Sequence, residues 1–276
     1  MKTVLPKYSV LMSVYAKEKN EFFRLAIDSM LNQTVAPDEI VIVEDGPLTE
    51  ELYATLRNFK ERYPQIIQIV KIEKNVGLGK ALNKGLIECK NQLVARMDTD
   101  DISLRERCEK QLVAFSKDIS LDICGTGTAQ FINSTDNIVS KSIYPNDDAA
   151  LKKFAKKRCP FNHMTVMFKK ESVLDVGNYQ DWHLNEDYFL WIRMMLAKMK
   201  FANIPEILVY SRVGNDRNKR RGGIKYFKSN FKIECFMYRK KIISLPLCLY
   251  NIAIRFFVQI MLPSSIRGFL FKLVER

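Results

Sequence analysis

Short apolar runs alternate with helical spacing through residue 97 of this chain, and this alternation constrains the fold more than any other feature. The expected strands are residues 8–15, 39–43, 66–72 and 92–97. The expected helices between them are residues 21–31, 49–63 and 80–89. Continuous apolar runs suit strands that are buried on both faces of a sheet. Strands that alternate with helices form βαβ units, so we predict an α/β fold with a mostly parallel sheet flanked by helices.

Beyond residue 101 the pattern loosens and favours a smaller antiparallel portion. The expected helices are residues 104–115, 147–157 and 184–199. The expected strands are residues 121–135, 138–143, 164–168 and 206–210. We therefore divide the chain into a body, residues 1–210, whose halves meet near residue 101, and a C-terminal helical extension, residues 211–276.

Three carboxylates follow the fourth apolar run, in the segment LVARMDTDD at residues 93–101. Asp98 and Asp100 form an Asp-x-Asp pair, and Asp101 follows them. Carboxylates are hard oxygen ligands that suit a divalent cation, and ligands of open α/β sheets bind at the carboxyl ends of strands. The alternative is that these acids belong to a loop and cap a helix that starts at Ser103.

Gly77, Gly79 and Lys80 invite comparison with phosphate-binding motifs, and both comparisons fail. A dinucleotide fingerprint needs glycine in place of Leu82, and a P-loop needs Ser or Thr in place of Ala81. Glycines still allow a backbone to approach a ligand closely. The alternative is a simple turn that leads into a helix.

Five motifs between residues 9 and 194 carry a resemblance to a known family. They are SVLMSVY, EIVIVEDG, NVGLGKALNKG, ARMDTDD and NEDYFLWIRM. In this order they resemble the family 2 glycosyltransferases, which have the Rossmann-like GT-A fold. The segment CPFNHMTVMFKKE is similar to bacterial enzymes that assemble capsule, exopolysaccharide and O-antigen units. The resemblance implies metal-dependent, inverting transfer of a sugar from a nucleotide sugar, usually UDP-linked, to a glycan acceptor.

The resemblance also assigns roles to strand-end residues. It implies that Val14 and Tyr15 line the nucleotide pocket and that Asp45 contacts the nucleotide base. Asp98 falls on the ribose side, and Asp100 falls on the Mg²⁺ or Mn²⁺ ion that bridges the diphosphate.

The glycine-containing loop departs from the family pattern. The family often has an arginine directly before the residue that is Asn83 here, and this chain has Leu82. We take Lys80 as the candidate for the role of that arginine and Gly77 as a residue of the donor site.

The Glu186–Asp187 pair matches the acidic motif of the family, whose aspartate is the general base. A carboxylate within hydrogen-bond reach can take the proton that the acceptor hydroxyl loses. The alternative is that both acids only complement a helix dipole. His163 is a further catalytic candidate, with a satisfied loop residue as the alternative. Trp182 either stacks on a sugar or acts as a hydrophobic staple, and Trp191 is expected in the core.

The charge is concentrated in the extension. After residue 210 the chain has 15 Lys and Arg against 3 Asp and Glu, so +12 of the net charge of +13 lies there. Between residues 212 and 241 these basic residues alternate with aromatic ones, as in helices that bind an anionic membrane surface. We expect a peripheral protein on the cytoplasmic face of the membrane, acting on a lipid-linked acceptor and not on nucleic acid. Packing of the extension on the body is the alternative.

A separate hypothesis is that Arg217, Arg220 and Arg221 close over the diphosphate. Of these, Arg220 is our candidate for the donor site.

The remaining features limit the function. Six cysteines show no CxxC pair or zinc-ligand spacing, which indicates reduced thiols in the cytosol. The Gln-x-x-Arg-Trp signature of processive synthases is absent, so we expect one sugar per acceptor. Two alternatives stay open: a haloacid dehalogenase-like phosphohydrolase that uses the Asp-x-Asp pair, and an inactive GT-A-like binding protein.

Overall fold

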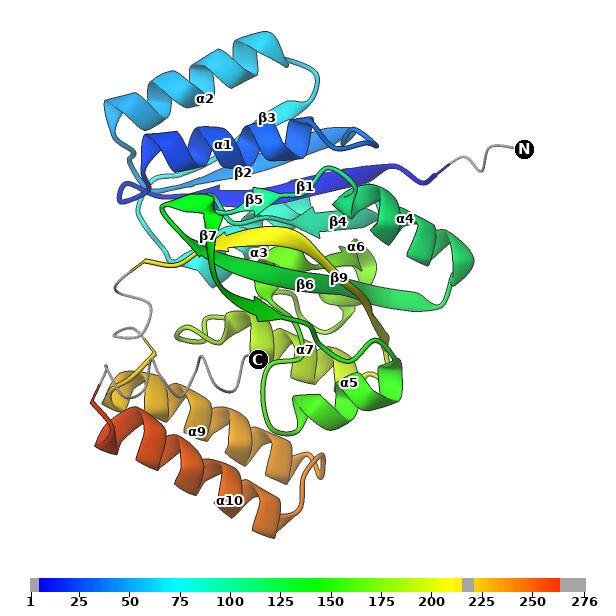
Figure 1. Ribbon diagram of the computed structural model, residues 1–276, viewed down its shortest axis with the longest axis vertical. Coiled ribbons are helices and arrows are strands. Elements are labelled where there is room, and N and C mark those ends of the chain that lie inside the picture. Colours follow the sequence, from blue (N-terminus) through cyan, green and yellow to red (C-terminus); the bar gives the residue numbers. More distant parts are fainter. Residues whose placement is uncertain (1–4, 215–220, 264–276) are drawn as a thin grey trace.

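The computed structural model describes residues 5–214 and 221–263 (Figure 1). Its strands form one sheet in the order β3-β2-β1-β4-β8-β6-β9-β5, with β7 paired to β6. The strands are β1 (Tyr8–Val14), β2 (Glu39–Asp45), β3 (Ile67–Ile72), β4 (Leu93–Arg96), β5 (Ile102–Ser103), β6 (Leu121–Ile132), β7 (Ser134–Ser142), β8 (Met167–Lys169) and β9 (Lys200–Arg212). β1 to β4 are parallel, whereas β8 pairs antiparallel with β4 and β6. The predicted fold class, including its smaller antiparallel portion, is confirmed.

Helices cover both faces of the sheet. They are α1 (Asn20–Leu31), α2 (Glu50–Arg62), α3 (Leu78–Glu88), α4 (Arg107–Lys117), α5 (Asp148–Ala155), α6 (Lys170–Asp175), α7 (Glu186–Leu196), α9 (Ile224–Arg239) and α10 (Leu245–Phe256), with a short 3-10 helix η1 (His163–Thr165) and a short π-helix η2 (Phe257–Met261). α1, α2 and α4 bury their apolar residues in one core. α3 and α7 bury theirs in a second core on the other face. A third cluster joins α7 to α9 and α10, which form the outermost layer of the molecule (Figure 1).

The register of the parallel strands brings the acidic strand ends to one edge. β1 lies between β2 and β4, with Val14 beside Glu44 and Leu11 beside Arg96. Because these strands run in the same direction, Asp45 and Asp98 leave the sheet at the same side. This is the edge at which open α/β sheets bind ligands.

Among the expected strands that differ from the structure, two have a clear physical cause. The prediction of a strand at 164–168 is wrong in its first half, because the Asn162 carbonyl accepts hydrogen bonds from both the amide and the hydroxyl of Thr165 and closes a tight turn. The strand expected at 206–210 is longer, because β9 pairs with β6 along most of its length. A shift in that pairing spans Pro205, which cannot donate a hydrogen bond to a sheet. The division of the chain at residue 210 stays a prediction.

Within the described ranges, none of the helices has both the length and the apolar character that crossing a bilayer requires.

Candidate active site

Asp98, Asp100 and Asp101 form a tight acidic cluster just after β4. One carboxylate oxygen from each lies within 4.8 Å of the others. Burial, followed by the charges of Asp98 and Glu18, raises the pKa of Asp100 to about 7. Burial and the neighbouring aspartates raise the pKa of Asp101 as well. Like charges held this closely favour proton uptake, and a bound cation would relieve the same repulsion.

The donor set fits a divalent cation. Asp101 Oδ1 accepts a hydrogen bond from the Arg212 amide at 2.7 Å, but its buried Oδ2 has no hydrogen-bond partner among the described residues. Three carboxylates with a spare buried oxygen provide the oxygen ligands that Mg²⁺ and Mn²⁺ prefer. Ser103 belongs to β5, so the alternative in which these acids lead directly to a cap at Ser103 is wrong.

Arg212, which the sequence did not single out, fixes the cluster from β9. Its Nε donates to the Asp100 carbonyl at 3.1 Å, and its amide holds Asp101. The guanidinium lies 3.7 Å from the ring centroid of Phe22 and 4.5 Å from that of Phe131. Two aromatic faces and the Nε hydrogen bond leave this side chain little freedom, and the backbone amide adds a second bond, so the end of β9 is tied to the acidic cluster.

Arg96 is the second residue that sequence reasoning missed. It is 1% exposed, and its Nη2 lies 2.5 Å from Asp98 Oδ1. Its positive charge lowers the pKa of Asp100, Glu186 and Asp187. The positive charge of one buried guanidinium therefore favours the ionised form of carboxylates in both acidic groups. The only signal in the sequence is a basic residue at the end of an otherwise apolar strand.

Asp45 orders the loop that precedes α3. Its carboxylate accepts hydrogen bonds from the amide of Val76 at 2.7 Å, the amide of Gly77 at 3.1 Å and the side chain of Asn75 at 3.0 Å. Gly77 has a φ of +87°, a conformation that favours glycine. The role of Asp45 at a nucleotide base stays a prediction. At the same edge Val14 is buried, and the neighbouring Tyr15 is 40% exposed.

The start of α3 packs against the segment that leads into α7. A Cβ added at Gly79 would come within 3.2 Å of the Glu186 Cβ and 3.1 Å of the Gln180 carbonyl oxygen. Lys80 Nζ forms an ion pair with Asp181 Oδ2 at 2.9 Å, and both side chains are largely exposed. Gly79 thus allows the glycine loop and the Glu186–Asp187 pair to lie side by side.

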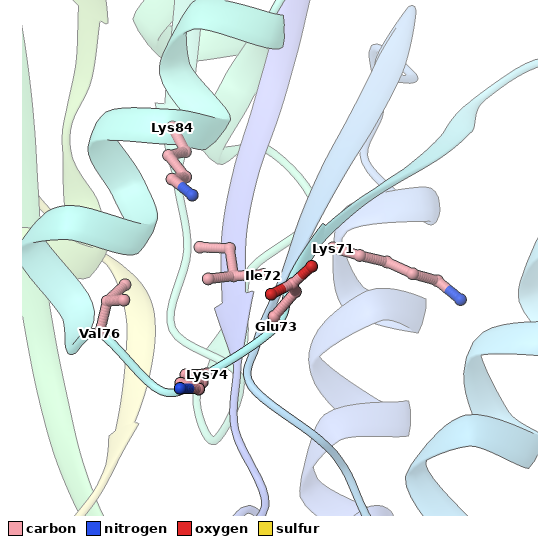
Figure 2. A pocket seen from close by; sticks show the side chains of 6 residues that line it. All are labelled: Lys71, Ile72, Glu73, Lys74, Val76 and Lys84. Carbon is pink, nitrogen blue, oxygen red and sulfur yellow. The ribbon is translucent and has the colours of Figure 1, made fainter.

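A cavity of about 450 Å³ lies beside the same loop but is not the candidate site. Figure 2 shows Lys84 projecting from α3 toward the loop, while Lys71 points away from it. The lining residues are Lys71, Ile72, Glu73, Lys74, Val76 and Lys84. None of these is a predicted site residue.

Glu186 and Asp187 form the first turn of α7. Burial, then the charge of Asp187 and, to a smaller extent, that of Asp98, raises the pKa of Glu186 to about 7. Burial also raises the pKa of Asp187, although the Tyr188 amide, which donates to Asp187 Oδ1 at 2.7 Å, and Arg221 act in the opposite direction. The effect of Asp98 on Glu186 places the two acidic groups within electrostatic reach of each other.

For the sugar transfer expected from the sequence, these raised pKa values predict an unusual pH dependence. Burial favours the protonated form, so a carboxylate that acts as base loses its proton only at higher pH than the usual value of about 4. We expect kcat/KM to fall as the pH decreases, with the acidic limb displaced upward from about pH 4. A profile between about pH 5 and 9 at saturating cation measures this limb. A constant kcat/KM over that range would contradict the expectation.

Asn185 occupies the N-cap position of α7 but does not cap the helix with its side chain. Its Nδ2 instead donates to Ser229 Oγ at 2.9 Å, because α9 packs against this end of α7. The sequence could not indicate this partner, which lies more than forty residues away.

His163 is a buried, neutral residue of η1. Its Nε2 lies 2.8 Å from the Tyr179 hydroxyl, and burial together with the charge of Arg96 holds its pKa well below the usual range. Its catalytic role stays a prediction.

The two tryptophans have packing roles. Trp182 stacks on Phe189 with ring centroids 3.9 Å apart, and its Nε1 donates to the Ser229 carbonyl. This arrangement fits a hydrophobic staple better than stacking of Trp182 on a sugar. Trp191 is fully buried, which confirms the prediction that it belongs to the core.

Arg217, Arg220 and Arg221, in the loop of residues 212–221, are the arginines that we expect to close over the diphosphate. Arg217 and Arg220 lie outside the described residues. Arg221 is described, and its charge lowers the pKa of Asp187. Closure of the loop over a diphosphate stays a prediction.

Residues 9–174 match the model of glycosyl transferase family 2, so the chain belongs to this family and is a glycosyltransferase. The chain is 40% identical over 272 residues to the UDP-Gal:alpha-D-GlcNAc-diphosphoundecaprenol beta-1,3-galactosyltransferase of Escherichia coli, covering 98% of this chain and 97% of the relative. It is 40% identical over 235 residues to the amylovoran biosynthesis glycosyltransferase AmsE of Erwinia amylovora, covering 85% of each. Family membership rules out the phosphohydrolase alternative.

A solved structure supports the fold independently. The mannosyltransferase PcManGT of Pyrobaculum calidifontis, solved with GDP-Man and Mn²⁺, superposes with a TM-score of 0.66 at 16% identity. The match covers 98% of this chain and 79% of that one. At this identity the likeness concerns the fold alone.

Proposed function

We propose that this enzyme transfers one sugar from a UDP-linked donor to a hydroxyl of a lipid-linked glycan acceptor, with inversion, in the biosynthesis of a bacterial surface polysaccharide. The observation that carries the proposal is the convergence of two acidic groups, Asp98–Asp100–Asp101 and Glu186–Asp187, around the buried Arg96 in a family 2 chain. The first group suits a divalent cation, which would in turn bind a diphosphate, and the second group suits removal of a proton.

In this proposal the two groups have different tasks. Asp100, with Asp98 and Asp101 beside it, would hold Mg²⁺ or Mn²⁺, which when bound supplies positive charge for the departing diphosphate. Asp187 takes the proton of the acceptor hydroxyl as that hydroxyl attacks the anomeric carbon. Arg96 orients Asp98, and Glu186 lies beside the base. Val14, Tyr15, Asp45, Gly77 and Lys80 are the proposed donor contacts at the edge of the sheet, with Arg220 and His163 as further site residues.

The relatives suggest the substrates and the place of action. The E. coli enzyme uses UDP-galactose and an N-acetylglucosaminyl diphosphoundecaprenol, and the E. amylovora enzyme functions in amylovoran biosynthesis. We carry the UDP-linked donor and the lipid diphosphate acceptor over to this chain as the first substrates to test. The body, residues 1–210, would perform the transfer, and the basic extension would keep the enzyme on the inner face of the cell membrane.

A panel of nucleotide sugars tests the proposal. The wild type is expected to bind a UDP-linked sugar, measured by calorimetry, only with Mg²⁺ or Mn²⁺ present, and to transfer that sugar to an N-acetylglucosaminyl diphospholipid. The anomeric configuration of the product reports inversion. Preference for a GDP- or dTDP-linked sugar would overturn the choice of donor, and binding of no nucleotide sugar would overturn the function.

A further inference from the structure

The last described helix has its apolar side facing outward. Within residues 245–263, which include α10 and η2, each exposed residue is apolar or aromatic. Leu249 is 58% exposed, Phe257 56% and Met261 61%. The others are Leu245, Pro246, Tyr250, Ala253, Ile254, Phe256 and Pro263. A surface helix of a water-soluble protein normally has the opposite arrangement, with its polar face toward solvent.

The polar side chains of the same helix point inward. Asn251 and Arg255, which are four residues apart on one face, both contact the buried Glu234 of α9 at 2.9 Å. Asn251 Nδ2 also donates to the Lys156 carbonyl, and Arg255 Nη2 donates to the Lys157 carbonyl, each at 2.9 Å. Glu234 is fully buried, so removing either partner would leave a buried group unsatisfied. These contacts fix the rotation of α10 and hold its apolar half outward.

The charges around this face have a single sign. Glu234 is the only acidic residue within the described residues 221–263, and it is buried. The exposed basic residues are Lys225, Lys228, Lys232, Arg239, Lys240 and Lys241. An apolar face beside such a basic region matches the acyl chains and anionic headgroups of a membrane surface. The same positive charges would oppose a symmetric contact with a second copy of the chain.

We propose that the outward half of α10 and η2, centred on Leu249, Tyr250 and Phe257, inserts into one leaflet of an anionic membrane. The basic residues of α9 then lie at the headgroups. The inference rests on the proposed function only for the choice of the inner leaflet. It goes beyond attraction by the basic extension, because the apolar face binds lipid through burial and not through charge.

Co-sedimentation of the full chain with vesicles of phosphatidylglycerol and phosphatidylcholine tests the insertion. The wild type is expected to bind at low salt and to keep part of this binding at about 0.5 M salt, where surface charges are screened. Leu249→Glu combined with Phe257→Glu is expected to reduce binding by about tenfold or more, and the corresponding glutamine pair by a smaller factor. Ile87→Glu and Ile119→Glu are matched controls, because both side chains are exposed on the body; binding within about twofold of the wild type is expected.

Three results would overturn the inference. They are equal vesicle binding by the wild type and the glutamate pair, complete loss of wild-type binding at high salt, and a wild-type dimer that the pair dissociates without any vesicle binding. Donor binding in the absence of lipid, measured in parallel, is expected to be unchanged in the pair. A wild type that binds vesicles but no nucleotide sugar would refute the proposed function and leave the insertion standing.

Discussion

Replacing Asp187 with asparagine is expected to lower kcat by about 10²–10⁴-fold, because the acceptor hydroxyl loses its proton acceptor while the shape of the site is kept. Asp187 Oδ1 accepts a hydrogen bond from the Tyr188 amide, and an asparagine oxygen can accept it equally well. Affinity for the nucleotide sugar should therefore change little. Steady-state kinetics with a saturating acceptor and calorimetry with the donor measure the two effects separately.

Asp175→Asn is the matched control for this experiment, because Asp175 is exposed at the end of α6 and belongs to neither acidic group. Its kcat should equal that of the wild type. If Asp187→Asn retained wild-type kcat over the whole pH range, another residue would have to be the base, and Glu186, with a pKa of about 7, would be the next candidate.

Replacing Asp100 with asparagine is expected to weaken cation-dependent donor binding by more than about 100-fold, since loss of a direct ligand should exceed the 10–100-fold effect of residues that only orient ligands. The substitution also removes one of the charges that raise the pKa of Asp101. The free variant should consequently be at least as stable as the wild type. Calorimetric titration of donor with and without Mn²⁺, together with thermal melting, checks both expectations.

The outcome for Asp100 distinguishes a ligand from a merely structural residue. A structural role would lower the melting temperature and affect donor binding with and without the cation alike. Donor binding by Asp100→Asn that equals the wild type in both conditions would remove the cation from the proposal.

The N-terminal half of the fold could be predicted because its helices and strands are determined by residues that are close together in the sequence. Continuous apolar strands separated by amphipathic helices are compatible with few folds other than a parallel α/β sheet. Strands β1 to β4 and helices α1 to α3 lie close to the expected ranges. The second half was harder, because its elements depend on distant partners. The length of β9, for example, follows from pairing with β6.

The candidate site also contains residues that the sequence could predict and residues that it could not. Asp98, Asp100 and Asp187 could be proposed from motifs, since their chemistry is visible in their residue type and in their place at the end of a strand or the start of a helix. Arg96 and Arg212 could not, because their importance lies in what they contact. An arginine in a strand carries no sequence signal for the carboxylate that it will orient.

The positions of Arg212 and Arg221 have a consequence for chain length. Arg212 is clamped between two rings at the Asp100–Asp101 cluster, and Arg221, nine positions later, acts on Asp187. Arg212 is therefore held at one acidic group by hydrogen bonds, whereas Arg221 acts on the other through its charge. Surface loops generally tolerate insertions and deletions well, but a change in the number of residues between Arg212 and Arg221 would change where the Arg221 charge lies relative to Asp187. Apart from Arg217 and Arg220, residues 213–220 should accept changes of residue type more readily than changes of length.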